Sequence, residues 1–76
     1  MIPLGRIGKV KQGPLTGWYI QAQVMEMPQG ILVSRARNAT MDQTLVLDGI
    51  FQTQAKLEAF FETNAPVVDW EAKARL

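Results

Sequence analysis

The sequence contains neither cysteine nor histidine. Without cysteine, no disulfide can form and no thiolate is available as a nucleophile or as a metal ligand. Without histidine, the chain lacks the commonest general base at neutral pH, and its serine and threonine hydroxyls have no imidazole to activate them. We therefore expect a protein that is not an enzyme and that binds no metal or other cofactor.

Long apolar runs are also missing. Runs such as residues 45–47 are far too short to span a bilayer, and residues 1–6 lack the long apolar core of a secretory signal. We therefore expect a cytoplasmic protein with no membrane partner.

The composition is that of a folded protein. Apolar residues make up 47% of the chain and charged residues 20%, which argues against disorder. The 76 residues have room for one domain, residues 1–76, with a modest core. A domain this small has a thin margin of stability, and oligomerisation is one way to widen it. We therefore expect a homodimer.

The formal net charge is only +1, but the charges are divided unevenly along the chain. Residues 1–40 carry five basic side chains and one acidic one, whereas residues 41–76 carry three basic and six acidic ones. Scatter over a solvated surface is the simpler explanation of this division. The acids show no calcium-loop spacing, and Glu58 and Glu62, four residues apart, are typical of a solvated helix face.

Alternating apolar and polar residues predict four strands, at residues 5–11, 18–25, 31–37 and 45–51. Turns at residues 13–17 and 27–30 and a polar loop at residues 38–44 separate these strands. In the second strand, Trp18, Ile20 and Val24 share one face, which we expect to lie beneath a helix. Tyr19 and Met25 fall on the opposite face.

A helix is predicted over residues 54–63. The hydroxyl of Thr53 can cap it by accepting a hydrogen bond from an early helical N–H group. Leu57, Phe60 and Phe61 are spaced to form one apolar stripe, which we expect to pack on the sheet.

The helix has clear signals for its end. Asn64 can end it in a left-handed conformation, and Pro66 prevents its continuation. Residues 67–70 predict a final edge strand, and residues 71–76 a frayed turn helped by a Glu71–Arg75 pair. The order β-β-β-β-α-β predicts an α+β fold, with an antiparallel sheet of four to five strands and one helix on one face.

One set of residues suggests nucleic-acid binding. Residues 10–17, Val-Lys-Gln-Gly-Pro-Leu-Thr-Gly, resemble the start of a KOW motif from the small SH3-like barrels of ribosomal and transcription-elongation proteins, although the further glycine of that motif is missing. Four basic residues beside the Tyr19 ring are candidates for a patch that binds phosphates: Lys9, Lys11, Arg35 and Arg37. The small net charge argues against this function.

Another set suggests protein binding. Methionines adapt to irregular surfaces, and an exposed aromatic or apolar patch marks an interface. The candidate interface comprises Tyr19, Met25, Met27, Arg35, Arg37 and Met41. Further members of the sheet face are either Ile31 and Val33 or Leu32. These residues fill the second side of the sheet instead if the sheet curls over itself.

Most of the chain resembles a group of small bacterial proteins that are often placed with toxin-neutralising immunity proteins. The similar segments are residues 7–10 (Ile-Gly-Lys-Val), 17–20 (Gly-Trp-Tyr-Ile), 30–33 (Gly-Ile-Leu-Val), 48–51 (Asp-Gly-Ile-Phe), 57–61 (Leu-Glu-Ala-Phe-Phe) and 68–70 (Val-Asp-Trp). The group tends to be acidic after the third strand, where residues 38–44 carry a single acid. The resemblance implies a non-catalytic protein-binding module, such as an immunity-type or other macromolecule inhibitor, and assigns no binding residue. A small nucleic-acid-binding domain is the alternative.

Overall fold

The computed structural model describes residues 2–70 as a five-stranded sheet and one helix. The elements are β1 (Ile7–Gln12), β2 (Tyr19–Glu26), β3 (Gln29–Ala36), β4 (Leu45–Phe51), α1 (Gln54–Asn64) and β5 (Val67–Asp69). This is the predicted order, and each boundary lies within two residues of its predicted place. The α+β class is therefore confirmed. The turn predicted for residues 71–76 lies outside the described residues.

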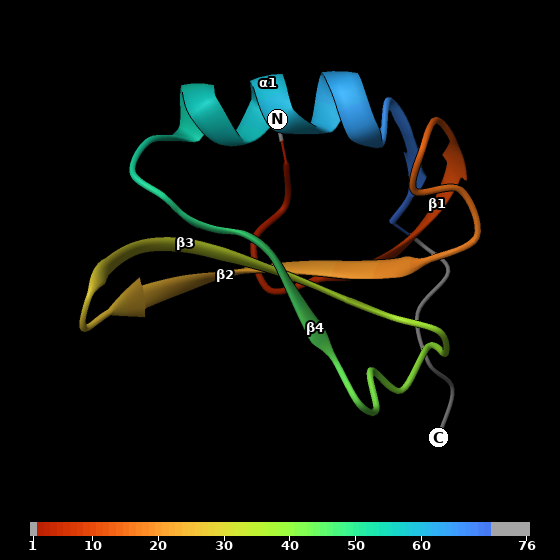
Figure 1. Cartoon of the computed structure of the whole chain (residues 1–76), viewed down its shortest axis with the longest axis horizontal. Coiled ribbons are helices and arrows are strands. Elements are labelled where there is room, and N and C mark those ends of the chain that lie inside the picture. The colour runs from red at the N-terminus through yellow and green to blue at the C-terminus, as the bar shows by residue number, and fades with distance from the viewer. Residues whose placement is uncertain (1, 71–76) are drawn as a thin grey trace.

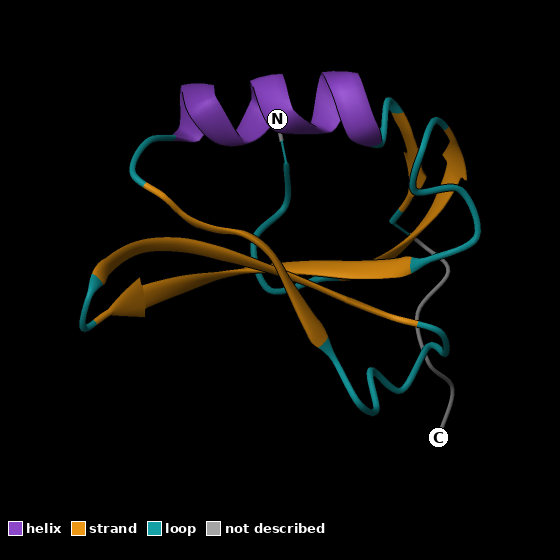
Figure 2. Cartoon of the chain, viewed as in Figure 1, coloured by secondary structure: helices purple, strands orange, loops and turns teal. Residues whose placement is uncertain are grey.

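All strand pairs are antiparallel, and the strand order is β4-β3-β2-β1-β5. β4 and β5 are the two edges, so the predicted final edge strand is confirmed. Figure 1 shows α1 lying along one side of the strongly twisted sheet, and Figure 2 shows loops where the strands reverse. The face that meets α1 is called the inner face below, and the opposite face is called the outer face.

The helix begins where the sequence predicts. The backbone N–H of Lys56 donates to the hydroxyl of Thr53 over 3.2 Å, which satisfies one N–H group that has no partner inside the helix. Leu57 and Phe61 are buried, and Phe60 packs half-buried beside them, 5.1 Å from the ring of Phe51. The predicted apolar stripe is therefore confirmed.

The core lies between α1 and the inner face of the sheet. Its buried members are Val10, Ile20, Ala22, Val33, Phe51, Leu57, Phe61 and Ala65. The half-buried Trp70 closes one end by stacking on Phe61, with the ring centroids 6.0 Å apart. Gly8 makes room for this indole, because a Cβ atom there would lie 2.6 Å from Trp70 Cε3.

Three sequence-based expectations about these elements are wrong. Of the residues expected beneath the helix, only Ile20 is fully buried; Val24 is 62% exposed because it lies towards the β2–β3 turn. Trp18 is half-buried and contacts arginines instead of the helix. Asn64 stays inside the helix, where its side chain donates to the Phe60 carbonyl over 3.0 Å, and Ala65 is the C-cap residue, with a φ of −148° and not in a left-handed conformation.

β2 and β3 form a long hairpin that determines which residues share a face. A two-residue turn, Met27–Pro28, with a cis peptide bond joins the strands, and Glu26 pairs with Gln29. The register places Val33 opposite Ala22 on the inner face. Leu32 therefore belongs to the outer face, because successive residues of a strand point to opposite sides.

β4 carries an irregularity that interrupts its pairing with β3. Leu47 pairs with Val33 and Ile50 with Leu32, so Asp48 and Gly49 are inserted between consecutive rungs. Both inserted residues have positive φ angles, 54° and 74°. Because two residues are inserted, the alternation resumes in phase, as the sequence pattern predicts.

Candidate binding surfaces

The outer face of the sheet carries a group of apolar side chains. The helix of residues 2–70, α1, lies along the other side of the sheet (Figure 1). We call Met25, Leu32, Val46 and Ile50 the outer apolar group. Leu32 lies opposite Ile50 in the β3–β4 ladder, and the Ile50 side chain lies over Gly30, where a Cβ atom would collide with it. Val46 is 56% exposed, and the other three are partly exposed. The group spans β2, β3 and the edge strand β4.

Tyr19 lies on the same face, but far from Met25 of the outer apolar group. It is six residues from Met25 along β2, about 20 Å at the usual rise of an extended strand. Gln21 and Gln23 lie between them on that face. The ammonium group of Lys9 lies 5.5 Å from the centroid of the Tyr19 ring. Tyr19 and Met25 are therefore at opposite ends of β2, and the two residues of that strand between them on this face are polar.

Arg35 and Arg37 gather around Trp18, and we call these three residues the Trp18 cluster. The guanidinium carbons of Arg35 and Arg37 lie 4.2 Å and 3.7 Å from the centroid of the indole ring. Arg35 pairs with Ile20, which places it on the inner face, at the end of the sheet where β2 begins. The Nε atom of Arg35 is buried and has no hydrogen-bond partner.

The predicted basic patch is thus divided between the two faces of the sheet. Lys9 contacts Tyr19 on the outer face, whereas Arg35 and Arg37 contact Trp18 on the inner face. Sequence reasoning assigned Trp18 to the core and so missed its role. The hairpin register contained the missing signal, because a two-residue turn at residues 27–28 brings Trp18 level with Arg37.

The remaining residues of the predicted interface lie elsewhere. Met27 is at the tip of the β2–β3 hairpin and is 91% exposed. Met41 is half-buried in the loop between β3 and β4. In this loop the Thr40 hydroxyl is 2.8 Å from the Asn38 side-chain oxygen and 2.9 Å from a carboxylate oxygen of Asp42. The six predicted interface residues therefore do not form one continuous surface.

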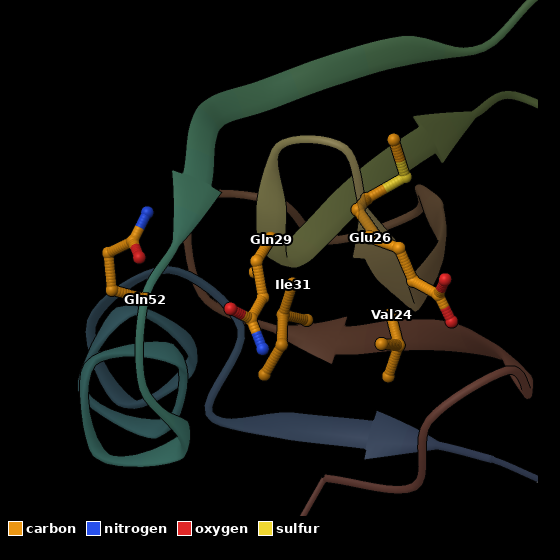
Figure 3. A pocket seen from close by; sticks show the side chains of 7 residues that line it. Val24, Glu26, Gln29, Ile31 and Gln52 are labelled. Carbon is orange, nitrogen blue, oxygen red and sulfur yellow. The ribbon is translucent and has the colours of Figure 1, made fainter.

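Hollows lie beside the hairpin tip and beside the end of α1 on the described part of the surface. The larger, of about 700 Å³, lies beside the hairpin tip, where Val24 and Ile31 point to the same side and Gln52 approaches from the start of α1 (Figure 3). Glu26 is its single ionisable side chain. The smaller, of about 260 Å³, lies beside the end of α1 and is lined by Glu58 and Glu62. Within residues 2–70, no three acidic side chains converge as metal ligands would.

The sequence matches no protein-family model, and comparisons with curated proteins and with solved structures found no match. In the part of the chain that the structure describes, no helix is long and apolar enough to cross a membrane.

Proposed function

We propose that this chain is a non-catalytic protein-binding module that receives another protein on its outer face. The outer apolar group is the observation that carries the proposal. Four large apolar side chains gather there on neighbouring strands, and contiguous exposed apolar surface of this kind marks interaction sites. When a partner binds to this face, the module covers the partner's own active surface and so inhibits the partner, which is the role that the resemblance to immunity-type proteins implies.

The aromatic side chains support a protein partner over a nucleic acid. Proteins that bind single-stranded nucleic acids stack bases on free aromatic rings along a continuous basic groove. Here cationic groups already lie over the rings of Trp18 and Tyr19. A base would have to displace these cations before it could stack. Within residues 2–70, the separation of Lys9 from Arg35 and Arg37 on opposite faces also argues against a single track for a phosphate backbone.

The proposal predicts cross-linking from one face of the sheet. A photo-reactive amino acid at position 46 should cross-link a protein partner in cells that express the chain. The same amino acid at position 24 is a matched control, because Val24 is 62% and Val46 56% exposed but they lie on opposite faces. Mass spectrometry of the linked species identifies the partner.

Binding of the purified partner then tests the face directly. Val46→Lys should weaken the affinity by about tenfold or more, since a charge placed within an apolar contact must be desolvated. Val24→Lys should leave it unchanged. Both valines are exposed, so both variants should fold. Equal effects of the two lysines, or cross-linking from position 24 alone, would contradict the proposal.

We expect a second copy of the chain to be one protein that the outer face receives. A twofold dimer through this face covers two apolar groups at once. Light scattering of the isolated protein should give twice the monomer mass of 8.5 kDa at high concentration, and Val46→Lys should restore the monomer mass. A mass that stays at 8.5 kDa at every concentration would rule out self-association.

A further inference from the structure

We propose that the Trp18 cluster is a second binding site, which holds a carboxylate of an acidic segment in the protein partner. The inference rests on the proposed function because the segment belongs to that partner. It adds the chemistry of the partner and a place of contact on the inner face. Arg35 and Arg37 supply the contacts, and Trp18 holds them in position.

Two positive charges are concentrated at this site without an acid from the described chain. Within residues 2–70, neither Arg35 nor Arg37 forms an ion pair with a carboxylate, and each instead stacks on Trp18. The buried Nε of Arg35 has no acceptor, although buried donors in folded proteins nearly always have one. The fold therefore holds two like charges close together and leaves one donor unsatisfied. An anion beside the exposed Arg37 guanidinium offsets the repulsion between the two charges.

The stacked guanidinium groups are suited to a carboxylate. A guanidinium is a planar fork of N–H donors that matches the two oxygens of a carboxylate. Both groups lie within 4.2 Å of the indole centroid, so much of their freedom is already lost before an anion arrives. Less entropy is then lost when the anion binds, which strengthens binding. The position of the pair at the strand end leaves Arg37 exposed for a segment to reach it.

The arrangement favours an acidic peptide over a nucleic acid. The site holds two cations against one indole ring. The other basic side chain with a described ring contact, Lys9, is on the opposite face. A phosphodiester chain gains its affinity from many spaced contacts along a groove. A single acidic side chain, or two in succession, fits a pair of arginines two residues apart, one near the end of β3 and one directly after it.

A titration of the full chain with hexaglutamate peptide at low salt tests the site. Proton–nitrogen correlation spectra follow the Arg35 Nε–H and Trp18 indole N–H resonances. Both should shift and saturate. Arg35→Lys and Arg37→Lys keep the charge but lose the planar fork, and each should weaken binding by about tenfold, because hydrogen bonds to charged groups are the strong ones. Arg6→Lys, the same substitution outside the cluster, should change little.

The results of this titration test the Trp18 cluster independently of the outer face. Val46→Lys should leave hexaglutamate binding unchanged, so loss of partner binding in that variant does not affect the test of the cluster. Arg37 is exposed, so its variant reports even if Arg35→Lys does not fold. No shift of either resonance, or no loss in Arg37→Lys, would overturn the inference. Tighter binding of hexathymidylate at the same resonances would overturn it in favour of nucleic acid.

Discussion

Phe61→Ala should destabilise the protein by roughly 3–5 kcal/mol, the usual effect of truncating a buried phenylalanine. Phe61 is 3% exposed and contacts two other aromatic rings, those of Phe60 and Trp70, at centroid distances of 6.1 Å and 6.0 Å. The substitution leaves a cavity and removes the ring on which Trp70 stacks. In a domain of this size each kcal/mol lowers the Tm by about 4–8 °C, so a loss of more than about 12 °C is expected. Thermal unfolding followed by circular dichroism measures it.

Phe60→Ala is the matched control for that experiment. Phe60 is the same residue type on the same helix, but it is only half-buried at the margin of the core. Its truncation should therefore lower the Tm clearly less than that of Phe61. If Phe60→Ala is the more damaging of the two, or if neither changes the Tm, the facing of α1 described above is wrong.

Gly13→Ala should be the second strongly destabilising substitution. Gly13 has a φ of +98°, a left-handed conformation that costs residues other than glycine about 1–2 kcal/mol. An added Cβ would also lie 2.5 Å from Pro66 Cδ and 3.0 Å from the backbone oxygen of Asn64. That oxygen accepts the N–H of Leu15, so the collision pushes the β1–β2 turn away from the end of α1. With overpacking of about 1–3 kcal/mol added, we expect a total of roughly 2–5 kcal/mol.

Gly17→Ala separates the two causes. Gly17 lies in the same turn with a similar φ of +91°, but a Cβ there meets nothing within 4 Å. Alanine reduces the entropy of the unfolded chain equally at both positions, so this effect cancels in the comparison. Chemical denaturation should therefore show Gly13→Ala to be less stable than Gly17→Ala by the energy of the collision. Equal losses would mean that the turn does not contact α1 as described.

Local patterns were sufficient to predict the elements of this fold. The alternation in β2 and the spacing of Leu57 and Phe61 in the sequence match the burial of these residues in the structure. Thr53 caps the helix through its own side chain, which is a purely local interaction. How much of the sheet the helix covers is not determined by local sequence. The exposure of Val24 depends on how far α1 reaches across the sheet, and a single strand does not encode that distance.

The candidate site was less accessible from the sequence. Sequence reasoning named Arg35 and Arg37 but paired them with the wrong ring, because Trp18 reads as a core residue and Tyr19 as an exposed one. The two rings are neighbours in the chain, Trp18 directly before β2 and Tyr19 at its first position, and they lie on opposite faces of the sheet. Only the hairpin register therefore decides which ring meets the arginines. The outer apolar group depended on the same register, which selects Leu32 instead of Ile31 and Val33 for that face.

The inserted pair Asp48 and Gly49 affects whether copies of this protein can aggregate through the edges of their sheets. An exposed edge strand is a template on which further strands can polymerise into fibrils, provided that its backbone groups stay evenly spaced. In β4 the insertion breaks that spacing between Leu47 and Ile50, so an added strand cannot remain in step along the whole edge. The opposite edge, β5, is only three residues long. The chain can therefore display valines and leucines on its surface while both ends of its sheet resist open-ended growth.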